Sequence, residues 1–154
     1  MKGAKGSRGR GAKGMIKNYK DLTVWKRAYQ LCLTVYSATK EFPREERYGL
    51  ISQIRRAAVS IPGNIAEGHG RKSKAEYIQF LYVAYGSICE LETQVMLADD
   101  LKYAGEGSLR RVQEDIGDVE RMLKGLIKSL KNPLPLDPFF NYAFKNSQCN
   151  INRY

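Results

Sequence analysis

The sequence predicts an all-α protein folded as an up-down-up-down four-helix bundle. Along four segments of roughly twenty to thirty residues, apolar side chains recur every three or four positions, the spacing of one helix face. The connections between these segments are only a few residues long, which favours antiparallel neighbours. No segment shows a strand pattern of alternating apolar and polar residues.

The first helix is expected over residues 21–41, with Asp21 as its N-cap and Pro43 beyond its end. One apolar stripe consists of Leu22, Trp25, Tyr29, Cys32 and Tyr36. A second stripe beside it consists of Val24, Ala28, Leu31 and Val35. With two stripes the helix is expected to bury more than one side, and the surplus beyond one stripe is predicted to mediate self-association.

The second helix is expected over residues 45–67. Its apolar residues recur at helical spacing: Ile51, Ile54, Ala58, Ile61 and Ile65. Pro62 lies within this segment and has no N–H to donate to the carbonyl of Ala58. Gly68 and Gly70 mark the end of the helix.

Two heptad-patterned helices complete the bundle. Ser73 and Glu76 have capping-box spacing at the start of the third helix, which continues to about Tyr103. Its stripe is Tyr77, Leu81, Ala84, Ile88, Leu91, Val95 and Ala98. The fourth helix, over 108–131 with Ser108 as its cap, carries Leu109, Val112, Ile116, Val119, Leu123, Leu126 and Leu130.

The chain is predicted to have three parts: a basic arm over 1–18, the bundle over 19–131, and a tail over 132–154. The first 20 residues hold seven Lys and Arg and no acid, and so supply +7 of the net charge of +10. Five of the first 14 residues are glycine, which predicts a disordered arm. Met15 follows this glycine-rich stretch, so it stays open whether translation begins at Met1 or at Met15. The irregular tail mixes prolines with aromatic residues and is expected to pack on the bundle or on another subunit.

Composition excludes several classes of protein. No apolar run reaches the roughly 18–20 residues of a membrane span, and no secretory signal is evident. Three widely spaced cysteines give neither a disulfide framework nor a zinc motif, so a reducing cytoplasm is expected.

No catalytic or cofactor site is expected either. His69 is the only histidine, and Ala66 stands three positions before it, where a carboxylate-bridged metal site in a bundle has a glutamate. The glycines of the arm are not followed by the Gly-Lys-Ser/Thr of a phosphate loop. Cys32 and Cys89 are interpreted as structural thiols. We therefore predict no metal, no cofactor and no enzymatic activity.

Nucleic-acid binding has the strongest physical motive, because clustered cations release counterions when they contact phosphates. The candidate residues are Lys2, Lys5, Arg8, Arg10, Lys13, Lys17, Lys20, Arg55, Arg56, Arg71, Lys72 and Lys74. An alternative stays open for Arg55 and Arg56, which could instead pair with Glu67, Glu90 or Glu92 within or between subunits.

Several stretches of the sequence resemble a known family. They are the run from Tyr19 to Lys26, the stretch from Gln53 to Pro62, the run from Asn64 to Gly68, and Gly86-Ser87 with the segment from Glu90 to Gln94. Over residues 19–131 the chain resembles the four-helix-bundle proteins encoded in intervening sequences of bacterial 23S rRNA genes. The resemblance implies a homopentamer. It also implies a fold shared with accessory variability proteins of diversity-generating retroelements, which partner a reverse transcriptase and nucleic acid.

Two hypotheses about function follow. The first is a non-enzymatic, cytoplasmic homopentamer that binds the phosphate backbone of RNA or DNA, as an accessory to RNA processing or to a reverse transcriptase. The second is a protein-interaction scaffold without a direct nucleic-acid role. In either case the self-association surface is expected to combine the second stripe of the first helix with Tyr82, Tyr85 and Met96, unless the tail covers these residues.

Overall fold

A computed structural model describes residues 17–132. Within this range the elements are η1 Tyr19–Asp21, α1 Thr23–Ala38, η2 Arg44–Tyr48, α2 Leu50–His69, α3 Lys74–Asp100 and α4 Arg110–Lys131, where η denotes a 3-10 helix. No strand occurs between residues 17 and 132. The predicted all-α fold class is confirmed.

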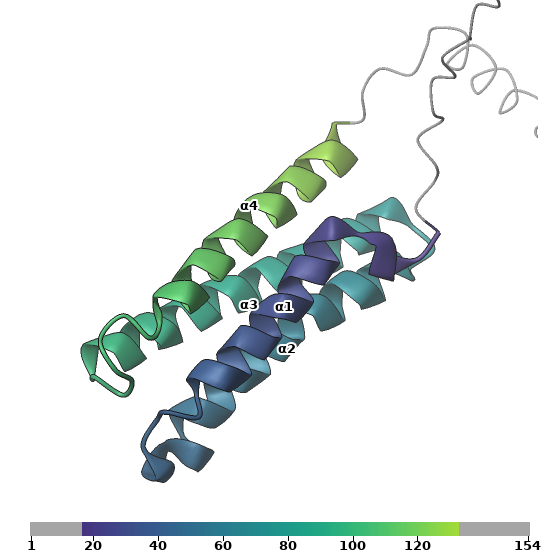
Figure 1. Ribbon diagram of the computed structural model, residues 1–154. Helices are drawn as coiled ribbons and strands as arrows, with labels where there is room; N and C mark the ends of the chain where they lie inside the picture. The colour runs from purple at the N-terminus through teal and green to yellow at the C-terminus, as the bar shows by residue number, and fades with distance from the viewer. Residues whose placement is uncertain (1–16, 133–154) are drawn as a thin grey trace, which may run out of the picture.

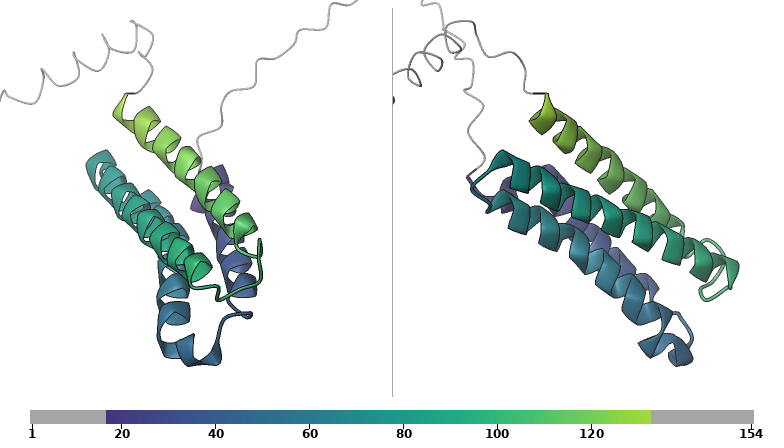
Figure 2. Two further views of the ribbon diagram at one scale, coloured as in Figure 1. Left: turned by 90° about the vertical axis from the view of Figure 1, so that its left-hand side faces the viewer. Right: turned by 180° about the vertical axis from the view of Figure 1, so that it is seen from behind.

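The four α-helices pack as an antiparallel bundle (Figure 1). Residues 17 and 132 lie at the same end of the bundle; α1 and α3 run away from this end, and α2 and α4 run back toward it. Each helix packs on its neighbour in sequence, and α4 also packs on α1. The views in Figure 2 show the same arrangement from the side and from behind. The bundle therefore has two ends: a terminal end, with the α2–α3 turn, and an opposite end, with η2 and the α3–α4 turn.

The most extensive contact between two helices is that of α2 with α3. The hydroxyls of Ser60 on α2 and Ser87 on α3 lie 2.9 Å apart across it. At Gly68 a Cβ atom would lie only 2.7 Å from the Cβ of Phe80. Glycine is thus required at the end of α2 because any side chain would push the two helices apart.

The predicted apolar stripe of α2 is buried in full. In α3, every predicted stripe residue from Leu81 to Ala98 is buried, and Tyr77 is half-buried. In α4 the stripe holds as far as Leu123, but Ile127 is then buried and Leu126 is only half-buried. A straight helix with 3.6 residues per turn drifts by about 20° per heptad, which moves the buried face by the last turns.

The first helix buries residues of both predicted stripes, so the prediction that the second stripe is left over for self-association was wrong. All four residues of the stripe assigned to self-association, Val24, Ala28, Leu31 and Val35, are buried inside the single bundle. In the other stripe Leu22 and Cys32 are also buried, whereas Tyr29 and Tyr36 are exposed. Because the four aliphatic residues pack against α2 and α4, they are not available as an oligomer interface.

Helix ends were predicted less well than helix faces. The Ser73 capping box is present: Ser73 Oγ accepts from the N–H of Glu76, whose carboxylate accepts from the N–H of Ser73. Asp21 and Ser108 do not cap the first and fourth helices, whose N-cap residues are Leu22 and Leu109. The segment predicted to open the second helix forms η2 instead.

The carbonyl that Pro62 leaves without a helical partner is satisfied by a thiol. Cys32 Sγ on α1 donates to the carbonyl oxygen of Ala58 at 3.1 Å. Burial raises the pKa of the Cys32 thiol to about 11, against the smaller opposing effect of a hydrogen bond with the backbone of Cys32 itself. The thiol therefore stays protonated near neutral pH and serves as a hydrogen-bond donor between α1 and α2.

We expect the two described cysteines to differ sharply in reactivity. Cys89 is exposed and Cys32 is buried, so in a Cys149→Ser variant at pH 8 Ellman's reagent should modify one thiol quickly. The second should react only after urea unfolds the chain, because the thiolate is the reactive form and burial disfavours it. Rapid reaction of two thiols in the folded protein would contradict this placement of Cys32, and a Cys89→Ser control should lose the fast phase.

Candidate nucleic-acid interface

A cationic groove lies on the α1–α2 face at the end of the bundle opposite the termini. One hollow of about 490 Å³ is lined mainly by Tyr36 from α1, Arg47 and Tyr48 from η2, and Arg55 and Arg56 from α2. An adjoining hollow of about 480 Å³ shares two of these arginines and adds Lys40 and Arg44. We call these two hollows together the arginine groove; its cations are Lys40, Arg44, Arg47, Arg55 and Arg56.

Local folding explains why these side chains meet. The chain reverses direction between α1 and α2, and η2 fills the turn, so its Arg47 and Tyr48 are placed beside the first turns of α2. Arg55 and Arg56 are consecutive and therefore about 100° apart around the helix. Arg56 consequently reaches solvent, whereas Arg55 is half-buried against α1.

Arg55 is held in place without being neutralised. Its Nε donates to Thr39 Oγ1 at 2.9 Å, and its guanidinium lies 4.7 Å from the ring centroid of Tyr36. Thr39 is itself buried and donates to the carbonyl of Val35. Hydrogen bonding and cation–π contact fix the orientation of the guanidinium while its positive charge remains.

No carboxylate lines either hollow, and none of the five groove cations forms an ion pair with a residue between 17 and 132. The nearby Glu46 is committed elsewhere. One of its oxygens accepts from the N–H of Leu50 at 2.9 Å, and the other accepts from the hydroxyl of Tyr103 at 2.9 Å. The bond from the Leu50 N–H is the main reason why the pKa of Glu46 is lowered. The groove therefore keeps its positive charge.

Arg55 pairs with none of its proposed carboxylate partners inside the subunit. Glu67 binds Arg71, and Glu90 accepts from the amide of Gln94. Arg55 instead bridges α1 and α2 through Thr39 and Tyr36.

The predicted basic residues do not form one surface. Arg71, Lys72 and Lys74 lie at the α2–α3 turn, roughly 20 Å along the helix axis from Arg55. Arg71 is paired with Glu67 and lies over the ring of Phe80. Lys72 and Lys74 are exposed at the terminal end of the bundle.

Of the seven basic side chains within residues 1–20, two belong to the described part of the chain and five do not. Lys17 and Lys20 are exposed at the terminal end of the bundle. Five predicted contacts lie outside the described residues: Lys2, Lys5, Arg8, Arg10 and Lys13.

Sequence reasoning missed Lys40, Arg44, Arg47 and Tyr48. Residues 40–48 hold three basic side chains, which could have indicated a cationic site. Glu41, Glu45 and Glu46 lie among them, so the net charge of this segment is zero. Only the fold separates the two signs, since Glu46 is directed to the start of α2 and neither Glu41 nor Glu45 lines the groove.

The predicted association residues of α3 lie at or near the surface. Tyr82 and Met96 are exposed, and Tyr85 is half-buried with its hydroxyl 3.4 Å from a Glu120 oxygen. On α1 the exposed apolar side chains are Tyr29, Leu33 and Tyr36. Exposed apolar positions thus exist on both helices, but on α1 they are not the ones predicted.

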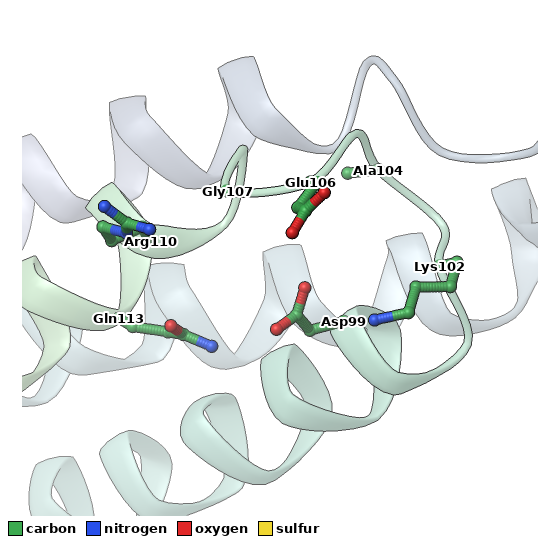
Figure 3. A pocket seen from close by; sticks show the side chains of 7 residues that line it. All are labelled: Asp99, Lys102, Ala104, Glu106, Gly107, Arg110 and Gln113. Atoms are coloured by element: carbon green, nitrogen blue, oxygen red, sulfur yellow. The ribbon is translucent and has the colours of Figure 1, made fainter.

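A further hollow of about 570 Å³ lies at the α3–α4 turn (Figure 3). The carboxylates of Asp99 and Glu106 are directed into it, with Lys102 on one side and Arg110 on the other. The charges in this lining balance, unlike those of the arginine groove. Between residues 17 and 132 no three His, Cys, Asp or Glu side chains come together as metal ligands.

None of the helices within residues 17–132 is both long and apolar enough to cross a membrane.

Comparison with known proteins agrees with this architecture. A crystal structure of a protein with unknown function from the S23 ribosomal protein family of Bacteroides thetaiotaomicron VPI-5482 superposes with a TM-score of 0.64 at 21% sequence identity. The match covers 69% of this chain and 99% of that one, and at this identity it shows a shared fold. No curated protein matches the chain. Residues 20–125 match the family of 23S rRNA-intervening sequence proteins, and with most of the bundle inside this match the chain belongs to that family.

Proposed function

We propose that this protein is a non-enzymatic, cytoplasmic bundle that assembles as a homopentamer and binds the phosphate backbone of nucleic acid, RNA first, through the arginine groove. The observation that supports it most is a groove whose lining holds no carboxylate and whose cations form no ion pair with any residue from 17 to 132. The match to the family of 23S rRNA-intervening sequence proteins favours RNA as the ligand. A role beside an RNA-processing or reverse-transcribing enzyme is part of the same proposal.

Self-association is part of this proposal. Leu33 is 51% exposed and Met96 is 56% exposed. Aliphatic side chains left in solvent on two helices favour burial against a second copy. In a ring of five subunits each groove would be repeated five times, and multivalent contact would raise avidity without new contacts per subunit.

Removing two groove charges is expected to weaken RNA binding by about tenfold. In fluorescence anisotropy with a labelled RNA oligonucleotide between 50 and 200 mM salt, an Arg47→Gln, Arg56→Gln double variant should also lose about 0.7–0.9 of the log–log salt slope per phosphate contact removed. Both side chains are exposed, so the fold should be unaffected.

The matched control is Lys102→Gln with Arg110→Gln, which removes the same charge beside Asp99 and Glu106. Equal weakening by both double variants would mean that net charge, not the groove, holds the RNA. Affinity no tighter than millimolar in low salt would reject the nucleic-acid role and favour the protein-interaction scaffold.

A further inference from the structure

The arginine groove contains two tyrosines in contact with arginines. The Arg55 guanidinium lies 4.7 Å from the ring centroid of Tyr36, and the Arg47 guanidinium lies 5.7 Å from that of Tyr48. The two tyrosines differ in exposure: Tyr36 is 43% exposed, while Tyr48 is 89% exposed. Tyr48 contributes almost nothing to the core, although it is a large aromatic residue on a short helix.

A ring this exposed is suited to stacking with a planar partner. Aromatic faces are costly to leave in water, and nucleobases stack on them irrespective of base identity. Cations lie in the hollow that Tyr48 lines, namely Arg47 and Arg56, and Arg44 lies in the adjoining hollow. The groove therefore offers a stacking surface together with phosphate contacts.

Single-stranded and duplex nucleic acids differ in whether they can use both features. A single strand presents unstacked bases alongside its phosphates, whereas a duplex keeps its base faces inside the helix and presents phosphates alone. We propose that the arginine groove is a site for single-stranded nucleic acid, in which a base stacks on Tyr48 and the neighbouring phosphates contact Arg44, Arg47 and Arg56. This inference rests on the proposed function and specifies the form of the ligand.

The experiment compares a labelled 12-nucleotide single-stranded RNA with a 12-base-pair RNA duplex containing the same strand, in anisotropy titrations of the full chain at one salt concentration. The wild type should bind the single strand several-fold more tightly. Tyr48→Leu should weaken single-strand binding about tenfold and leave duplex binding unchanged, because it removes the stacking ring but no charge. Tyr48→Phe, which keeps the ring, should bind as the wild type.

A salt series separates stacking from charge. Tyr48→Leu should leave the log–log salt slope for the single strand unchanged, whereas Arg47→Gln should lower it by about 0.7. Equal affinity for both probes, or equal weakening of both by Tyr48→Leu, would overturn the single-strand site and leave the proposed function standing. Absence of salt-dependent binding to either probe would overturn both. A Tyr48→Leu chain that sediments as a smaller assembly than the wild type would overturn the site by placing Tyr48 between subunits.

Discussion

Replacing Leu31 by alanine is expected to lower the free energy of unfolding by about 3 kcal/mol. Leu31 is 0% exposed within a single bundle, on the face of α1 that packs against α2 and α4. The truncation removes buried apolar atoms and leaves a cavity that a close-packed core fills only in part. Urea unfolding followed by circular dichroism, at one fixed protein concentration, measures the change.

The control for this prediction is Leu33→Ala, two residues further along the same helix. Leu33 is 51% exposed, so within the subunit its truncation should change stability by no more than about 0.5 kcal/mol. If Leu33 lies in the proposed oligomer contact, the variant should instead dissociate in sedimentation at lower concentrations than the wild type. If Leu31→Ala lost its assembly while its free energy of unfolding stayed that of the wild type, Leu31 would belong to an oligomer interface and not to the core.

The first helix shows where sequence patterns stop being informative. Apolar residues occupy two adjacent stripes in α1, and periodicity shows that both exist without showing which of their residues are buried. The aromatic residues Trp25 and Tyr29 stack on each other at 5.4 Å near the surface, and such partly polar rings tolerate exposure better than aliphatic side chains do. Packing against α2 and α4 decides which side chains of α1 are buried. The periodicity of α1 alone carries no information about the position of those two helices.

The buried faces of the second and third helices were predicted more closely. In each, the apolar stripe read from the sequence is buried, apart from the half-buried Tyr77 at the start of α3. The capping box of Ser73 was also predictable because it is local, involving two residues three positions apart. The link from Glu46 to Tyr103 is not local, since it joins residues 57 apart.

The same distinction applies to the candidate site. Arg55 and Arg56 were recognised because they are adjacent in the sequence, but the groove also needs η2, whose cations are mixed with acids along the chain. Only the folded structure separates these cations from the acids: the cations line the groove, while the Glu46 carboxylate accepts from the N–H of Leu50.

A second distant link, between α1 and α4, centres on Asp115, which is only 5% exposed. Its Oδ1 accepts from Arg111 at 3.1 Å and lies 3.5 Å from a nitrogen of Arg27, while its Oδ2 accepts from Thr34 at 3.1 Å. Arg27 and Thr34 belong to α1, so the carboxylate joins α4 to its neighbour. A buried carboxylate needs such partners, because an unsatisfied charge is costly in the interior.

Asp115→Ala is therefore expected to lower the free energy of unfolding by about 2 kcal/mol. The value is smaller than for a fully buried ion pair because the side chains of Arg27 and Arg111 are 33% and 67% exposed and are partly screened by water. Asp118 also binds Arg27, at 2.6 Å, but its side chain is 38% exposed, so Asp118→Ala should destabilise the fold less than Asp115→Ala does.

A double-mutant cycle distinguishes the inter-helix contact from a local effect on α4. Thr34→Val removes the hydroxyl that donates to Asp115 and keeps the side-chain volume. It should lower the free energy of unfolding by less in the Asp115→Ala background than in the wild type. A coupling of about 0.5–1 kcal/mol is expected because the two side chains share one hydrogen bond across the helices. Strict additivity, together with an Asp115→Ala variant within about 0.5 kcal/mol of the wild type, would show that apolar packing alone holds α4 against α1.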